Sequence, residues 1–211
     1  MITTFKFALI IVYLSLAGCI GADDKFGKTW IGAGAINAGG TISLPPNAPS
    51  MSNMYYEASD QYASTTGEEH LGIDIIATLG TPVIAPANGR IVKVFTEPFY
   101  GNNIIIDHGF DATGRPVHTQ YKHLQSQMVR VGDVVARGQQ IGTLGRTGLL
   151  SGGLLHLHFE VQLEGRFARM EPVNPHSYWI DGIGMVTCYE SSATYADSPF
   201  KITYPVVCLD N

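Results

Sequence analysis

Few of the 211 residues are charged, and neither sign of charge is in large excess. Charged residues make up 15% of the chain, and 13 Lys and Arg stand against 18 Asp and Glu, which gives a net charge of −5. This balance excludes the broad basic surface expected of a nucleic-acid binder, so we expect no nucleic-acid partner. The 24 glycines follow no Gly-X-Y period, which excludes collagen. No heptad run predicts a coiled coil.

The amino terminus carries an apolar run that is too short to cross a membrane. It extends over residues 7–17 and follows a single positive charge at Lys6. A spanning helix needs about 20 apolar residues, whereas this run has the length of a secretory signal. The following Leu16-Ala17-Gly18-Cys19 resembles a bacterial lipoprotein signal. We therefore expect a signal peptide over residues 1–18 and a membrane anchor through lipidated Cys19; an ordinary signal peptide with a chance cysteine is the alternative.

The segment after Cys19 has the composition of a linker. Residues 19–65 include GAGAINAGG and SLPPNAPS and show little amphipathic pattern. We expect a flexible tether that gives an anchored domain reach. Ile20 stands directly after the predicted lipidation site, which by resemblance to Gram-negative lipoproteins favours the periplasmic face of the outer membrane.

Only two further cysteines are present, Cys188 and Cys208. In an oxidising compartment two such cysteines can form a disulfide, and two unpaired buried thiols are the alternative. A zinc role is not favoured, because neither cysteine belongs to a Cys-x-x-Cys pair.

From residue 66 onward, short apolar or β-branched segments alternate with turn signals. This pattern predicts an all-β fold built on a small antiparallel sheet. The expected strands cover residues 73–77, 82–85, 89–95, 102–107, 117–123, 133–136, 140–144 and 155–163.

Three histidine motifs carry the chemistry of this region. On an extended segment His70, Gly72 and Asp74 share one face, and Gly72 leaves room for a metal or a bend. In residues 155–161 the alternation places His156, His158 and Glu160 on one face and the apolar side chains on the core face. His123 lies in the third motif, Tyr121-Lys122-His123-Leu124. Imidazole and carboxylate are ordinary zinc ligands.

Together these motifs resemble the lysostaphin-type (LytM-like) zinc metallopeptidases, which cut peptide bonds in peptidoglycan. The resemblance covers about residues 66–176 and leaves residues 177–211 as a C-terminal extension. It implies an all-β domain with a narrow groove and one zinc ion at its floor. By resemblance, His70, Asp74 and His158 would bind zinc, and His123 and His156 would be the catalytic pair, with the general base not assigned between them.

The resemblance implies a zinc endopeptidase that hydrolyses peptidoglycan cross-links, with peptide stems as its partner. The alternatives are a non-catalytic envelope module that activates another hydrolase, and a zinc peptidase acting on protein. A residue of the tether could add a fourth zinc ligand and hold the enzyme latent, and Asn53, Glu57 and Asp60 are the candidates.

Overall fold

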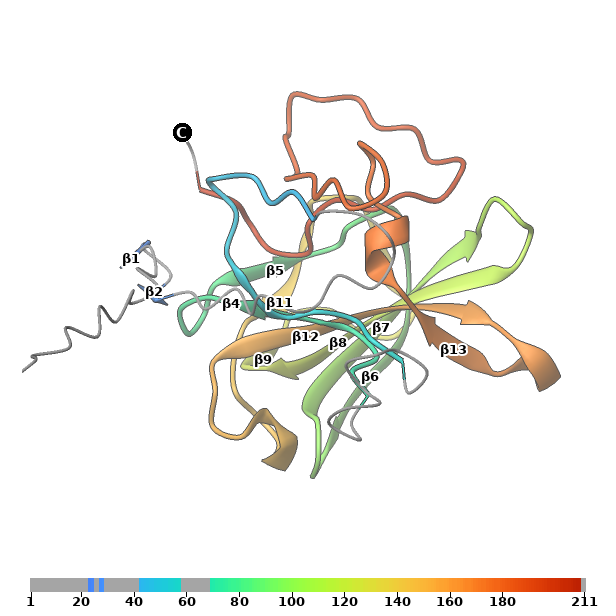
Figure 1. Ribbon diagram of the computed structural model, residues 1–211. Coiled ribbons are helices and arrows are strands. Elements are labelled where there is room, and N and C mark those ends of the chain that lie inside the picture. The colour runs from blue at the N-terminus through green and yellow to red at the C-terminus, as the bar shows by residue number, and fades with distance from the viewer. Residues whose placement is uncertain (1–22, 25–26, 29–41, 58–68, 210–211) are drawn as a thin grey trace, which may run out of the picture.

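The computed structural model describes residues 23–24, 27–28, 42–57 and 69–209, which form an almost purely β structure (Figure 1). Three short 3-10 helices interrupt the strands: η1 (Leu149–Ser151), η2 (Arg166–Ala168) and η3 (Pro175–Ser177). The strands are β1 (Asp23–Asp24), β2 (Gly27–Lys28), β3 (Met51–Asn53), β4 (Ile73–Ile76), β5 (Pro82–Ile84), β6 (Gly89–Glu97), β7 (Gly101–Phe110), β8 (Pro116–Leu124), β9 (Ser126–Gln127), β10 (Val134–Val135), β11 (Gln140–Thr143), β12 (His156–Glu164) and β13 (Met170–Val173).

The main sheet has the order β10-β6-β7-β8-β12-β4-β3, and β13 pairs with the second half of β12. A smaller sheet has the order β5-β11-β9, and β1 pairs with β2. The pairs between named strands are antiparallel, as expected for a β meander-like chain with short connections. The predicted all-β class is confirmed, and each of the eight expected strands is present. The sequence pattern gave no indication of β3, β9 or β13.

Strand β12 is an inner strand of the main sheet, between β8 and β4, and has two faces of different character. Leu157, Phe159 and Val161 are completely buried in the hydrophobic core, as the alternation predicts. Burial of each such side chain contributes about 1.5–3 kcal/mol relative to exposure. This packing fixes the register of β12, so the opposite face carries its polar side chains at defined positions.

Part of the predicted tether belongs to the folded domain. Residues 42–57 include β3, which pairs with β4 at the edge of the main sheet. Met51, Tyr55 and Tyr56 are buried, so this segment contributes to the core. The tether interpretation fails here because it rested on composition, whereas the apolar side chains of this segment reach a sheet edge that they cover. The predicted signal peptide and Cys19 lie outside the described residues.

The C-terminal extension is also part of the core. Trp179, Ile202 and Tyr204 are completely buried, and the Tyr204 hydroxyl donates a hydrogen bond to the Pro49 carbonyl at 2.7 Å. The expected boundary after residue 176 therefore divides a continuous core, and it falls inside η3.

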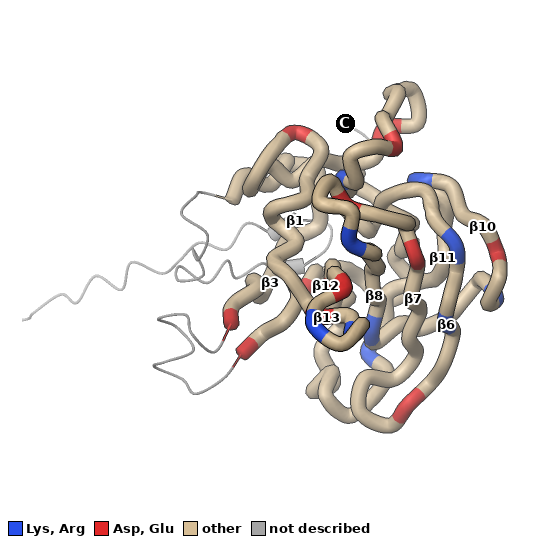
Figure 2. The backbone as a smooth tube through the Cα atoms, turned by 90° about the vertical axis from the view of Figure 1, so that its right-hand side faces the viewer, with Lys and Arg blue, Asp and Glu red and all other residues tan. Residues whose placement is uncertain are grey.

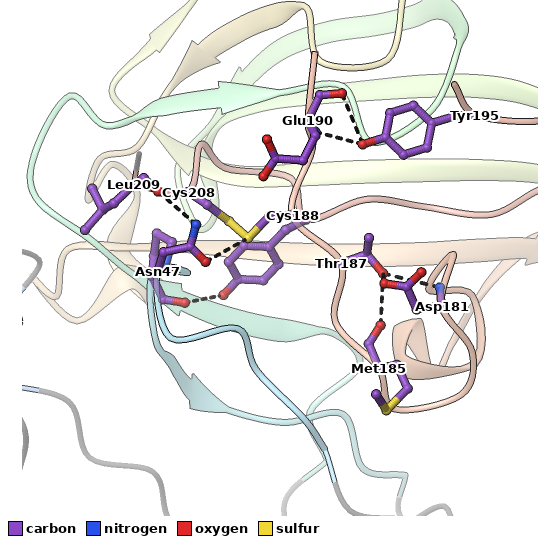
Figure 3. The surroundings of a disulfide bond; sticks show 11 residues. Asn47, Asp181, Met185, Thr187, Cys188, Glu190, Tyr195, Cys208 and Leu209 are labelled. Atoms are coloured by element: carbon purple, nitrogen blue, oxygen red, sulfur yellow. Dashed lines mark hydrogen bonds between the residues drawn. A yellow bond between two sulfur atoms is a disulfide. The ribbon is translucent and has the colours of Figure 1, made fainter. Parts of the chain in front are cut away.

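The predicted disulfide between Cys188 and Cys208 is confirmed (Figure 3). Next to it, the side chain of Asn47 donates to the Leu209 carbonyl at 2.8 Å, and the Leu209 amide donates to the Asn47 carbonyl at 2.8 Å. The disulfide thus links two parts of the C-terminal segment at the place where this segment contacts residues 42–57.

Charged positions are dispersed over the described fold, with Lys and Arg interspersed among Asp and Glu (Figure 2). Within the residues that the structure describes, no helix is long and apolar enough to cross a membrane.

Candidate metal centre and histidine cleft

Three predicted ligands converge where β4 meets β12. The pairing of these strands places Asp74 directly opposite His158. One Asp74 oxygen lies 2.9 Å from His158 Nδ1, and the other lies 3.1 Å from His70 Nε2. His70 Nε2 and His158 Nδ1 are 3.2 Å apart, and one donor atom from each of the three residues falls within 4.8 Å of the others.

Gly72 makes this convergence possible. A Cβ atom at this position would lie 2.7 Å from His158 Nε2 and 2.6 Å from the Phe159 carbonyl oxygen. Contacts of that length do not occur for real side chains, so only glycine allows His158 to lie beside the His70–Asp74 segment. This agrees with the expectation that Gly72 leaves room at the site.

The hydrogen bonds of His70 and His158 determine which nitrogen of each ring faces the centre. His70 Nδ1 lies 2.7 Å from the Met54 carbonyl, which can only accept, so Nδ1 carries the proton and Nε2 offers its lone pair. His158 Nε2 lies 3.0 Å from a Glu160 oxygen and donates its proton to it, so Nδ1 offers its lone pair toward the centre. Metal-binding histidines are typically held in this way, with the second nitrogen donating to a carbonyl or carboxylate.

His123 and His156 lie beside the three candidate ligands and have the same arrangement. His123 Nδ1 is 2.8 Å from the Thr147 carbonyl, and His156 Nδ1 is 3.2 Å from the Leu154 carbonyl. In both rings Nδ1 therefore donates and Nε2 is free to accept a proton. The centroids of the two rings are 4.7 Å apart, and His156 Nε2 lies 3.9 Å from Asp74.

His123 reaches the cleft through an unusual backbone conformation. Simple strand alternation places Lys122 of β8 on the face of His158, since these two residues are opposite each other in the register. His123 has a φ of 63°, a left-handed conformation that is uncommon for a residue with a side chain. This conformation interrupts the alternation and brings the imidazole beside His156.

Burial and charge set the protonation of these groups. Burial raises the pKa of Asp74, but hydrogen bonds from His158 and His70 outweigh it and hold the pKa well below its usual range. Burial lowers the pKa of His158, but Asp74 and Glu160 raise it further, so the net shift is upward. A field that attracts a proton to His158 Nδ1 also attracts a cation. Burial lowers the pKa of His123 to about 4 and also lowers that of His156, so both rings are neutral at neutral pH.

The sequence reasoning placed Glu160 on the histidine face but gave it no role, and it overlooked Lys122. Glu160 is only 3% exposed, and Lys122 forms a buried ion pair with it. Burial raises the pKa of Glu160, but His158 and Lys122 together lower it to about 2. The polar alternation of β12 continues to Gln162, whose amide donates to Glu160 at 2.6 Å. That continuation was the available signal for a buried polar network.

A cleft of about 420 Å³ opens over the candidate centre. Beyond the histidines, Asp74, Lys122 and Glu160, its wall is formed by Glu69, Leu71, Tyr100 and Leu150. The Lys122 ammonium lies 4.1 Å from the centre of the Tyr100 ring, and Leu150 belongs to η1 on the rim.

Of the candidate fourth ligands, the described residues Asn53 and Glu57 do not line the cleft. Asn53 accepts a hydrogen bond from the Met54 amide, and Glu57 accepts one from the Tyr55 hydroxyl. Asp60 lies outside the described residues. Of the remaining histidines, His176 is buried and accepts a hydrogen bond from the Trp179 indole.

The donor set fits zinc. Two imidazole nitrogens and a carboxylate oxygen converge, and two further neutral imidazoles face the same cleft, which matches a catalytic zinc site with three protein ligands and an open position. The fold and the site thus define a small all-β domain with a candidate mononuclear metal centre. Residues 68–175 match the model of peptidase family M23, and the chain belongs to this family.

Relatives and solved structures agree with that assignment. The chain is 38% identical over 105 residues to the peptidoglycan DD-endopeptidase ShyA of Vibrio cholerae, a match that covers 50% of this chain and 22% of ShyA. It is 38% identical over 106 residues to the lipoprotein NlpD of Yersinia enterocolitica, which covers 50% of this chain and 96% of that one. A zinc-containing peptidase from Vibrio cholerae superposes with a TM-score of 0.50 at 30% identity, over 63% of this chain and 37% of that chain.

Proposed function

We propose that this protein is a zinc-dependent endopeptidase that hydrolyses peptide bonds in peptidoglycan cross-links. The observation that carries the proposal is the set of four anchored histidines around Asp74. In each of them one ring nitrogen donates to an outer acceptor, while the other faces the cleft. Membership of peptidase family M23 and the peptidoglycan DD-endopeptidase activity for which ShyA is named support the same substrate class.

We propose that His70 Nε2, the Asp74 carboxylate and His158 Nδ1 hold one zinc ion per chain. Bound zinc would supply an activated water and polarise the scissile carbonyl. His123 and His156 would move the protons: one imidazole takes a proton from the attacking water as the C–O bond forms. Once protonated, that imidazole passes the proton to the amine nitrogen as the C–N bond breaks. The other imidazole would steady the developing oxyanion when its Nε2 carries a proton.

The bond that we propose as the substrate is the D-alanyl–diaminopimelate cross-link, with a glycyl bridge as the alternative. The relative ShyA is named a DD-endopeptidase, which favours the first bond. ShyA is much longer than the match, so this substrate assignment rests on about a fifth of its length.

The test is a digest of purified peptidoglycan sacculi by the full chain, with and without a zinc chelator, analysed by mass spectrometry. We expect chelator-sensitive conversion of cross-linked dimers to monomers, and the product masses identify the bond. His123→Gln and His158→Ala serve as inactive controls. Intact sacculi after treatment with a zinc-loaded chain would refute the proposal and would favour the module that activates another hydrolase.

We also propose that the protein is a lipoprotein of the cell envelope, anchored through Cys19 at the periplasmic face of the outer membrane. The expected result is incorporation of labelled fatty acid that Cys19→Ser abolishes, together with release of that variant into the soluble periplasmic fraction. Equal fractionation of the two proteins would refute the anchor.

A further inference from the structure

Glu160 is a buried carboxylate that contacts the candidate metal ligand His158. It stands two positions after His158 on the polar face of β12, and its side chain is almost inaccessible to solvent. One oxygen lies 3.0 Å from His158 Nε2 and also contacts the Lys122 ammonium. The other oxygen accepts a hydrogen bond from the Gln162 amide.

A polar network fixes the position of this carboxylate. The Gln162 amide also donates to the side-chain oxygen of Gln120 at 2.8 Å, and the Gln120 amide donates to that of Asn103 at 3.1 Å. The network therefore crosses from β12 through β8 to β7. Since these strands are paired along their length, Glu160 can move little without disturbing the sheet.

An ion pair buried in this way is weak evidence for stability, because apolar side chains of similar size often stabilise a fold as well or better. The contact with His158 gives the pair a different use. A carboxylate that accepts the outer N–H of a metal-binding imidazole fixes its tautomer and ring orientation and makes the other nitrogen a stronger donor.

We propose that Glu160 is the positioning residue for His158, and that the positive charge of Lys122 compensates the negative charge of the buried Glu160 carboxylate. Glu160 accepts the Nε2 proton of His158, so the Nδ1 lone pair is held toward Asp74 and His70. This inference rests on the proposed zinc site. It differs from a structural role because it predicts a loss of metal affinity that does not follow fold stability.

Lys122 allows the two roles to be separated. Glu160→Gln removes the charge that orients His158 and leaves Lys122 without its partner. Lys122→Met leaves Glu160 as an uncompensated buried carboxylate. The double variant E160Q/K122M removes both charges and leaves neither unpaired, so it relieves the structural penalty without restoring the carboxylate.

The experiment measures the zinc affinity of the full chain by competition with a chromogenic chelator. The free energy of unfolding of the zinc-free chain is measured by urea titration, in the presence of chelator, on the same protein preparations. We expect E160Q to bind zinc about 10–100-fold more weakly than the wild type. E160Q/K122M should recover stability relative to E160Q but keep the weakened affinity. The visible spectrum of the cobalt-substituted chain should change in both variants. Glu164→Gln on the same strand is the matched control and should bind zinc as the wild type does.

An affinity of E160Q within threefold of the wild type would overturn the inference. So would recovery of wild-type affinity by E160Q/K122M, because affinity would then follow stability. A wild-type chain that binds no zinc would overturn both this inference and the proposed function. Since hydrolysis is not part of the readout, a chain that shows the expected affinities but cuts no peptidoglycan would contradict only the proposed function.

Discussion

Lowering the pH should destabilise the fold through His176. This residue is 3% exposed, and its Nδ1 accepts a hydrogen bond from the completely buried Trp179 indole at 3.0 Å. Its Nε2 is buried and has no partner among the described residues. Burial lowers the pKa of His176 from 6.5 to about 4, because a charged ring in this environment has lost its water.

The sign follows from linkage. Between pH 6.5 and 4 the unfolded chain binds a proton at this residue that the folded chain does not, so the free energy of unfolding falls as the pH falls. Above about pH 6.5 His176 is neutral in both the folded and the unfolded chain, so no stability is lost through this residue. A shift from 6.5 to about 4 corresponds to about 2.5 kcal/mol already lost at pH 4.5. This is a large share of the roughly 5–15 kcal/mol that stabilises a typical domain.

The assay is urea unfolding of the full chain in chelator at pH 7.5, 6.5, 5.5 and 4.5, compared with His176→Gln. The variant removes the titrating group, whereas the other histidines stay in both proteins. The wild type should lose about 2.5 kcal/mol more than the variant across this range. Parallel curves, separated by a constant difference at every pH, would refute the reasoning.

Three further predictions concern the site and the disulfide. His123→Gln should leave zinc affinity, measured by chelator competition, within about threefold of the wild type. It should reduce the rate of hydrolysis by about 10²–10⁴-fold, the usual contribution of an acid–base group. Loss of zinc binding would contradict this prediction. Gly72→Ala should lower both zinc affinity and the melting temperature, because its Cβ would meet His158; normal zinc binding by a stable variant would contradict it. Replacing Cys188 and Cys208 by serine should cost about 3 kcal/mol in urea unfolding and leave zinc affinity unchanged; an unchanged stability would contradict it.

The fold could be predicted where residue pattern and burial follow the same period. The strand β12 shows this clearly, since its apolar residues occupy the core face and its polar residues the other. The pattern failed for residues 42–57, whose Pro-rich first half concealed the following strand that pairs with β4. A short edge strand is stabilised by a neighbour far away in the sequence, and single-sequence periodicity does not contain that neighbour.

The candidate site could be predicted only as a set of residue types. The motifs assigned five residues to one predicted site, and the structure places all five around one cleft: His70, Asp74, His123, His156 and His158. The positive φ of His123 could not be read from its motif, because alternation favours Lys122 on that face. The acceptor for His70 could not be read either, since a backbone carbonyl at Met54 carries no sequence signal.

That last contact also changes what counts as the site. The matched family region covers residues 68–175, whereas Met54 lies before it and orients His70 from the added strand segment. The same segment pairs with His70 through the backbone of Tyr56, with both hydrogen bonds at 2.9 Å. A metal-binding ring is only as well placed as the group that holds its second nitrogen. The candidate centre is therefore completed by a segment outside the matched family region, and residues 42–57 contribute to its geometry as well as to the core.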